Sequence, residues 1–136
     1  MWKNWSGFVE CPQTPVLTPD SSAALAQVLA DAARDGKPVR MVGAGHSFSP
    51  LVASDGVIVS LDKLQGVIAV DAQTHVARVH AGTRLHALGA ALAQRGLAME
   101  NLGDINVQSV AGATSTGTHG TGIRSEDTRL NSSHRP

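Results

Sequence analysis

The stretch Met41-Val-Gly-Ala-Gly-His-Ser-Phe-Ser-Pro50 decides how this chain can be interpreted, because two glycines, a histidine and a serine follow an apolar run. The run Pro38–Val42 is typical of a buried strand. Glycines after a strand let backbone N–H groups converge on an anion without obstruction by Cβ atoms. The stretch is therefore compatible with a phosphate cradle, a metal site or an ordinary turn.

A dinucleotide fold of the Rossmann kind does not fit this stretch. That fold needs a third glycine three residues after Gly45, and the residue at that position is Phe48. The following Ser49-Pro50 also disfavours an immediate long helix. What remains is either an anion-binding pair of glycines or a plain strand-to-loop turn.

A second glycine-rich stretch, Gly112-Ala-Thr-Ser-Thr-Gly-Thr-His-Gly-Thr-Gly122, has the Gly-x-x-x-x-Gly spacing of a Walker loop. The Walker loop requires Lys where this chain has Thr118. The neutral, donor-rich segment suits a pyrophosphate, and a flexible Gly/Thr linker is the alternative. Two such segments in one small domain suggest a dinucleotide held by backbone amides and hydroxyls.

Hydrophobic periodicity predicts a strand, a helix, four strands, a second helix, a short strand and a long loop. The first helix should begin after Pro19-Asp20-Ser21-Ser22 and end at Gly36, and Gly96 should end the second. Helices and strands do not alternate strictly, which favours an α+β fold over a doubly wound parallel sheet. The expected strands are 16–18, 38–42, 57–61, 67–70, 75–80 and 97–99, the helices 23–34 and 85–92, and the loop 101–122. Strands 67–70 and 75–80 should form a hairpin.

Composition narrows the possible functions. The 136 residues suffice for one domain, and 11 basic and 11 acidic residues balance without any Lys/Arg run, which argues against nucleic-acid binding. No stretch approaches the roughly 18 apolar residues of a membrane span, and no signal-peptide core is present. Cys11 is the single cysteine, so no internal disulfide is expected. The expected compartment is the cytoplasm.

His46 has three possible roles: an ordinary loop residue, a metal ligand or a nucleophile. His75, His80 and His86 have no ligand-like spacing, and His119 is the other histidine of the glycine-rich segments. One histidine among glycines without an acidic cluster makes a poor metal site, so no metal is expected. An imidazole can also act as a nucleophile.

Several separated motifs resemble the FAD domain of the vanillyl-alcohol-oxidase-type (PCMH-type) flavoproteins, most closely the aldonolactone and alditol oxidase group. The resemblance extends from the first residues to Gly122 and implies a truncated α+β FAD-binding domain of two small α/β subdomains. The motifs are Asn4-Trp-Ser-Gly7, Arg40-Met-Val-Gly-Ala-Gly-His-Ser-Phe-Ser-Pro-Leu51, Asn101-Leu-Gly-Asp-Ile105, Ser109-Val-Ala-Gly112 and Gly117-Thr-His-Gly120.

The resemblance implies that Val42–Ser47 wrap the FAD pyrophosphate and that His46 bonds covalently to the 8α-methyl carbon of the flavin. Trp2 and Trp5 are expected to pack the N-terminal strand. No catalytic residue is expected within the chain. The implied cofactor-binding residues are Val42, Gly43, Ala44, Gly45, His46, Ser47, Ser109, Gly112, Thr114, Gly117, Thr118, His119 and Gly120.

Family members are longer and carry a substrate domain after the FAD domain, so the chain resembles an N-terminal fragment with a partial FAD-binding domain over residues 1–122. The parent enzyme would oxidise an alcohol of a sugar lactone or polyol, passing hydride to FAD and then electrons to oxygen or another acceptor. Membrane association of the parent is left open. A non-catalytic nucleotide-binding module and an inactive truncated fragment are the alternatives.

The segment 123–136 does not continue this pattern. It has several charges, a single large apolar residue after Ile123, Leu130, and neither strand nor helix periodicity. It is either a disordered tail or non-native sequence, since Ser125–His134 resembles translated sequencing adapter. We favour the second interpretation and exclude the segment from the fold.

Overall fold

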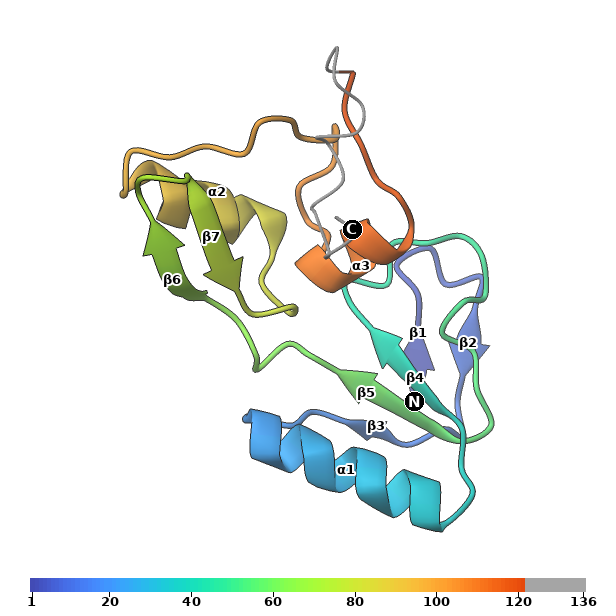
Figure 1. Cartoon of the computed structure of the whole chain (residues 1–136). Coiled ribbons are helices and arrows are strands. Elements are labelled where there is room, and N and C mark those ends of the chain that lie inside the picture. Colours follow the sequence, from blue (N-terminus) through green and yellow to red (C-terminus); the bar gives the residue numbers. More distant parts are fainter. Residues whose placement is uncertain (122–136) are drawn as a thin grey trace, which may run out of the picture. The chain divides into compact units, whose positions relative to one another are not determined.

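The structure is a computed structural model that describes residues 1–121. Two compact units make up the chain, one of residues 1–64 and one from Gln65 onward (Figure 1). The tail expected over 123–136 lies outside the described residues, as does Gly122. A mixture of helices and short strands in two small units confirms the predicted α+β class.

The first unit is built on a three-stranded sheet. Its order is β3-β5-β4, with β3 at Val16–Leu17, β5 at Val57–Ser60 and β4 at Val39–Val42. Both pairings are parallel. Every residue of the central strand β5 is buried, which explains its run of β-branched residues. The glycine-rich stretch follows β4 directly.

Helix α1 (Ser22–Arg34) connects β3 to β4 and runs alongside the sheet (Figure 1). The Ser21 hydroxyl caps its N-terminus by accepting from the N–H of Ala24 at 3.1 Å. Gly36 follows its C-terminus with φ of +63°, and the N–H of Lys37 donates back to the carbonyl of Ala32. The predicted helix start and stop are therefore confirmed.

A small N-terminal hairpin completes the first unit and was not predicted. It pairs β1 (Trp2–Lys3) antiparallel with β2 (Glu10–Cys11). Cys11 is buried with Val42 and Ile58 in the core, and Trp2 packs against this cluster. The hairpin thus brings residues 4–9 to the same unit as the end of β4.

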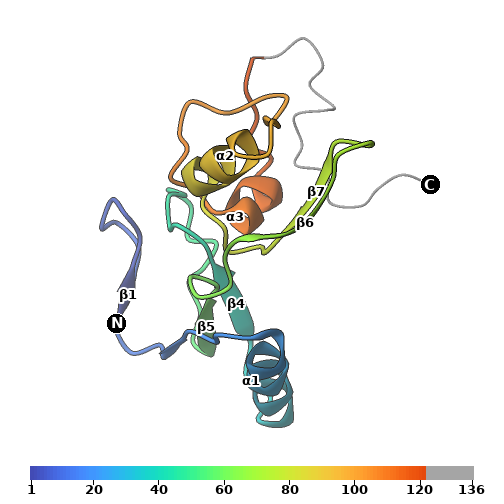
Figure 2. The ribbon, with the colours of Figure 1, turned by 90° about the vertical axis from the view of Figure 1, so that its left-hand side faces the viewer.

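The second unit begins with the predicted hairpin. Its strands β6 (Val67–Asp71) and β7 (Val76–Val79) pair antiparallel and form one twisted ribbon (Figure 2). The Oδ1 atom of Asp71 accepts the N–H groups of Gln73 and Thr74 in the turn. Hydrogen bonds from the Thr74 side chain and from these two N–H groups hold the pKa of Asp71 below its usual value.

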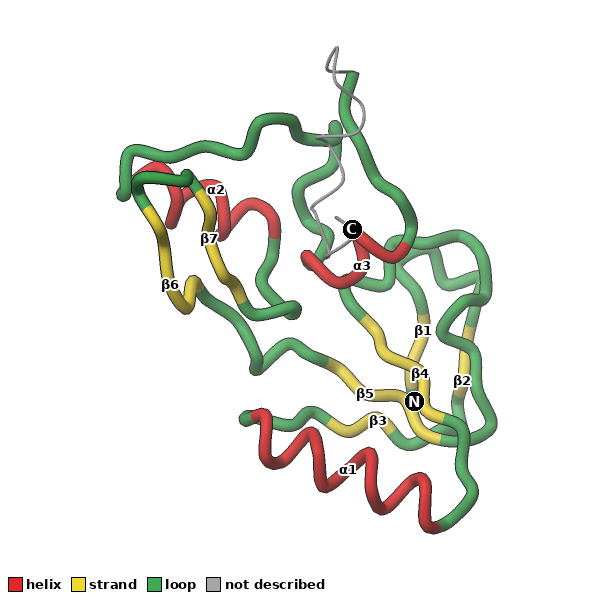
Figure 3. Tube along the Cα trace, viewed as in Figure 1, coloured by secondary structure: helices red, strands yellow, loops and turns green. Residues whose placement is uncertain are grey.

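Two helices follow in the second unit, α2 (Leu85–Ala93) and α3 (Val110–Ser115). Gly96 follows α2 with φ of +69°, as predicted. The strand predicted at 97–99 is wrong, because the N–H of Leu97 donates to the carbonyl of Leu92 and closes the end of α2. This part of the chain is loop (Figure 3).

The prediction that residues 101–122 form a loop throughout is also wrong, because α3 lies within them. The helix is short, and hydrogen bonds from outside it support its first turn. The N–H groups of Val110 and Ala111 donate to the carbonyls of Thr83 and Ala81. Across residues 1–121, no helix has both the length and the apolar character that crossing a membrane requires.

Two glycines provide a paired test of the fold. A Cβ atom at Gly56 would overlap the carbonyl oxygen of Pro38, whereas one at Gly89 within α2 would meet no atom within 4 Å. Gly56→Ala should therefore lower the free energy of unfolding by about 1–3 kcal/mol. Gly89→Ala should raise it by about 0.5–1 kcal/mol, because alanine is the better helix former. Urea unfolding followed by circular dichroism measures both, and equal effects would contradict the structure.

Candidate functional site

The loop after β4 turns through Gly45, whose φ is +67°. This left-handed conformation favours glycine. A Cβ atom there would lie 3.5 Å from Cζ2 of Trp2, which is an ordinary contact. The backbone angle, and not crowding, therefore selects glycine at this position.

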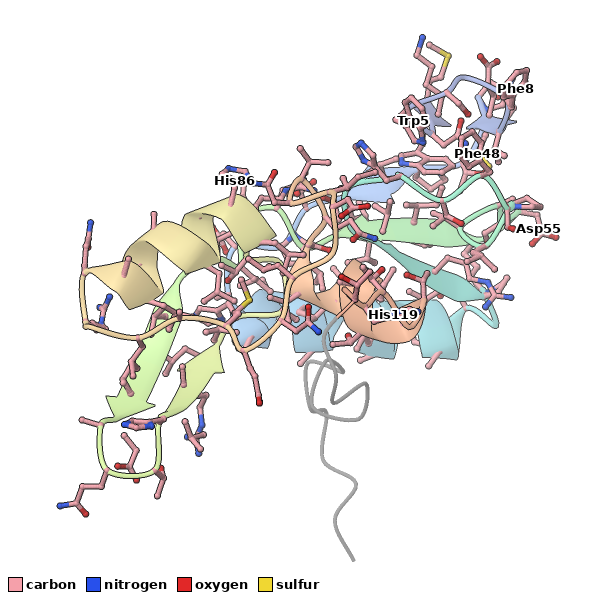
Figure 4. The ribbon with its side chains drawn as sticks, turned by 90° about the horizontal axis from the view of Figure 1, so that it is seen from above. Trp5, Phe8, Phe48, Asp55, His86 and His119 are labelled. Carbon is pink, nitrogen blue, oxygen red and sulfur yellow. The ribbon has the colours of Figure 1, made fainter. Side chains whose placement is uncertain are left out.

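Trp5 holds this loop from the N-terminal hairpin. Its backbone N–H donates to the carbonyl of Gly45 at 3.0 Å, and its Nε1–H donates to the carbonyl of His46 at 2.9 Å. The indole stacks on the His46 ring with centroids 5.4 Å apart and planes 9° apart. Phe48 packs edge-on against Trp5 (Figure 4). The expectation that Trp5 packs the N-terminal strand is therefore wrong, whereas Trp2 does pack there.

Asn4 holds the glycine loop at Ser47, the residue after His46. It is buried, and its Nδ2 donates to the carbonyl of Ser47 at 3.1 Å. Its Oδ1 accepts from the hydroxyl of Ser6 and from the N–H of Val9. The side chain thus connects the hairpin turn with the glycine loop. Neither Asn4 nor Trp5 was predicted as a site residue, although both lie in the motif Asn4–Gly7.

The backbone carbonyls and the backbone N–H groups of residues 44–47 differ in their hydrogen bonding. All four carbonyls accept a hydrogen bond, that of Ala44 from Nδ1 of His46 at 3.3 Å and the other three from Asn4 and Trp5. By contrast, no acceptor in residues 1–121 takes the backbone N–H of any of these four residues. Consecutive unpartnered N–H groups on a half-buried loop are suited to an anion.

The first predicted residues of the second glycine-rich segment lie in or next to α3. The buried Ser109 hydroxyl caps the helix by accepting the N–H of Gly112 at 3.1 Å. The Thr114 hydroxyl donates to the carbonyl of Val110 at 2.9 Å. Gly117 follows the helix with φ of +65°. These residues therefore build the helix, and their contact with a cofactor stays a prediction.

Thr118, His119 and Gly120 lie against an earlier part of the second unit. A Cβ atom at Gly120 would overlap the carbonyl oxygen of Leu102, and one at Gly103 would lie 3.1 Å from Cγ2 of Thr118. Segments 101–103 and 118–120 are therefore packed too closely for a larger residue at Gly120, and Gly103 has little room to spare. His119 is exposed, and its Nδ1 lies 2.9 Å from the carbonyl oxygen of Gly120 (Figure 4).

Gln108 is a polar residue of this unit that the sequence did not indicate. Its Nε2 donates to the hydroxyl oxygen of Thr118 at 3.0 Å. Its Oε1 is buried and has no hydrogen-bond partner within residues 1–121. Leaving such an acceptor unpaired costs about 1–3 kcal/mol, so the position suits a donor from a ligand or an ordered water.

The site residues thus fall into two groups. Val42–Ser47 lie in the first unit, where Asn4 and Trp5 hold them, and residues 109–120 lie in the second unit. Neither stretch contains Lys or Arg, so any anion would be bound by aligned N–H groups and hydroxyls. In the described part of the chain, no three His, Cys, Asp or Glu side chains are placed to share a metal ion.

Comparison with known protein families identifies the class of the chain. A family model described as an FAD binding domain matches residues 14–131. The chain therefore belongs to this family of FAD-binding domains.

Similar proteins are longer than this chain. The L-gulono-1,4-lactone dehydrogenase of Mycobacterium tuberculosis is 48% identical over 124 residues, covering 91% of this chain and 29% of that protein. The D-arabinono-1,4-lactone oxidase of Kluyveromyces lactis is 37% identical over 88% of this chain and 24% of its own length. The chain thus spans less than a third of either relative.

A solved structure has the same fold. The cholesterol oxidase of Brevibacterium sterolicum superposes with a TM-score of 0.76 at 26% identity, covering 88% of this chain and 24% of that one. The similarity supports the fold assignment and extends over about a quarter of the cholesterol oxidase chain.

The Asn4 contacts can be tested through stability. Asn4→Leu would leave the Ser47 carbonyl and the Val9 N–H without their side-chain partner, and should lower the free energy of unfolding by about 2–3 kcal/mol. Ser6→Ala removes one partly buried hydrogen bond to Asn4 and leaves the other two Asn4 contacts in place, so it should cost only about 1 kcal/mol. Chemical unfolding of both variants measures the difference. A Leu variant as stable as the Ala variant would contradict this role of Asn4.

Proposed function

We propose that this chain is the N-terminal FAD-binding part of a flavin-dependent oxidoreductase that oxidises an alcohol of a sugar lactone or polyol. The family match supports FAD, and the names of the similar lactone dehydrogenase and lactone oxidase support the substrate class. Residues 1–122 form the partial FAD-binding domain, and the substrate-handling residues lie in the remainder of a longer protein. The substrate is a small molecule, and the proposed compartment is the cytoplasm.

The single observation that carries this proposal is the run of unpartnered N–H groups at residues 44–47. A pyrophosphate has several anionic oxygens that accept hydrogen bonds, and consecutive main-chain N–H groups bind such groups without a charged side chain. The Ser47 hydroxyl can add one more donor. The residues present therefore fit the diphosphate part of FAD.

The second unit, considered by itself, also has polar groups that suit FAD. The buried Oε1 of Gln108 lacks a donor within the described chain, and FAD offers N–H and hydroxyl donors on its ring system and ribityl chain. Gln108 is joined by its Nε2 to Thr118, and the predicted residues His119 and Gly120 follow directly in the chain.

His46 is the proposed point of covalent attachment. When bound, FAD supplies a two-electron acceptor, both for the substrate hydride and for a bond between its 8α-methyl carbon and an imidazole nitrogen. Such a C–N bond would replace one C–H bond of the methyl group and the N–H bond of the imidazole. The two protons and two electrons would pass to the flavin ring, which molecular oxygen would then reoxidise. The chain contributes an imidazole held by Trp5 and by the carbonyl of Ala44.

Acid denaturation tests this attachment. The whole reading frame that encodes this chain is expressed, and the purified protein is precipitated in acid. We expect flavin fluorescence to stay on the protein, and His46→Ala to release all of it. His75→Asn is the matched control, since His75 has φ of 56° in the β6–β7 turn and Asn tolerates that conformation.

Two results would contradict the proposal at different levels. Complete release of flavin from the unmodified protein in acid would refute the covalent bond and leave FAD binding intact. Tighter binding of ATP with Mg²⁺ than of FAD would refute the flavin cofactor and favour a non-catalytic nucleotide-binding module. Isothermal titration with FAD, ADP and ATP distinguishes these cofactors.

A further inference from the structure

We propose that Trp5 is a positioning residue that orients the His46 imidazole for covalent attachment of the flavin. The inference rests on the proposed attachment at His46. It concerns a residue that acts through His46 and does not itself form the bond to the flavin. Its basis is the set of three contacts that Trp5 makes with two consecutive loop residues.

The contacts fix both the backbone and the ring of His46. The backbone N–H of Trp5 and its Nε1–H hold the carbonyls of Gly45 and His46 at 3.0 and 2.9 Å. The indole then lies on the imidazole with the two planes only 9° apart. A histidine side chain on a glycine loop has two freely rotating bonds, and stacking restricts both. Trp5 therefore restrains the imidazole plane, together with the Ala44 carbonyl oxygen, which lies 3.3 Å from Nδ1 of His46.

Phe48 supports the indole in turn. Its ring meets Trp5 edge-on, with centroids 5.3 Å apart and planes 70° apart. Edge-to-face contact is a favoured geometry for aromatic pairs. The Trp5 ring thus contacts both His46 and Phe48, two residues of the glycine loop, and these contacts restrain the tilt of the indole.

Trp5 is not needed for the core. It is 55% exposed, and the core cluster of this unit consists of Cys11, Val42 and Ile58, with Trp2 packed against it. A large exposed aromatic residue with two side-chain contacts to one histidine is better explained by that histidine than by stability. The backbone contact to Gly45 persists whatever side chain replaces the indole, so substitutions at position 5 leave one loop contact in place.

The expected consequence is a change in the rate of attachment and not in the amount of FAD bound. Misplacing a reacting group by about 1 Å can cost on the order of 100-fold in rate. The N–H groups of residues 44–47 that we assign to the pyrophosphate make no hydrogen bond with Trp5. Non-covalent binding of FAD should therefore survive when the indole is removed.

The experiment follows covalent incorporation over time in the full-length protein. Apoprotein is mixed with FAD in air, samples are quenched in acid, and intact mass spectrometry gives the flavinylated fraction. Trp5→Leu should slow attachment by at least about tenfold. Trp5→Phe keeps a ring for stacking but loses the Nε1–H donor, so its rate should be intermediate. Phe8→Leu changes an 85% exposed aromatic residue of the same turn and should react within about twofold of the unmodified protein.

Total bound flavin and thermal unfolding are measured alongside. A slow Trp5→Leu variant with unchanged total flavin and an unchanged unfolding midpoint supports the positioning role. Attachment at the unmodified rate overturns it, as does a parallel loss of total flavin and stability, which would make Trp5 a structural residue. If the unmodified protein itself forms no acid-stable flavin, the proposed attachment at His46 is wrong and this inference fails with it. That result is seen in the unmodified protein, so it is distinguishable from the two results for Trp5→Leu.

Discussion

The contact between the N-terminal turn and the glycine loop is the interaction on which the site depends. Donors of Asn4 and Trp5 occupy three consecutive carbonyls of the loop, and His46 occupies the one before them. The N–H groups of the same residues have no hydrogen-bond acceptor within residues 1–121. The loop is held in a shape in which its carbonyls are occupied and its backbone N–H groups are available to an anion.

This constraint explains why the first unit is arranged as it is. The buried parallel strand β5 supports β4, and the hairpin of β1 and β2 packs on the same core through Cys11 and Trp2. Both partners of the contact are therefore anchored to one hydrophobic cluster. Gly45 supplies the left-handed turn that lets the loop fold back onto the hairpin. The buried core, the left-handed conformation of Gly45 and the hydrogen bonds from the hairpin all hold the glycine loop in the same conformation.

Sequence reasoning succeeded where the signal is local. Ser21 and Gly36 bound α1 as predicted, and Asp71 lies at the start of the hairpin turn. It failed where the determining contacts are remote. Trp5 and His46 are 41 residues apart. Helix α3 has only six residues, among them Gly112 and three β-branched or hydroxyl residues that are weaker helix formers than alanine. The Ser109 cap and hydrogen bonds to the carbonyls of residues 81 and 83 stabilise it. The resemblance indicated the cofactor, but the contacts that hold the loop became visible only in the structure.

A crystal structure of the full-length protein with FAD tests the central claim most directly, because it measures the distances from the pyrophosphate oxygens to the backbone nitrogens of residues 44–47. The account predicts several of these distances at about 2.7–3.2 Å, with the carbonyls still held by Asn4 and Trp5. A pyrophosphate bound elsewhere, with these N–H groups facing solvent, would contradict it.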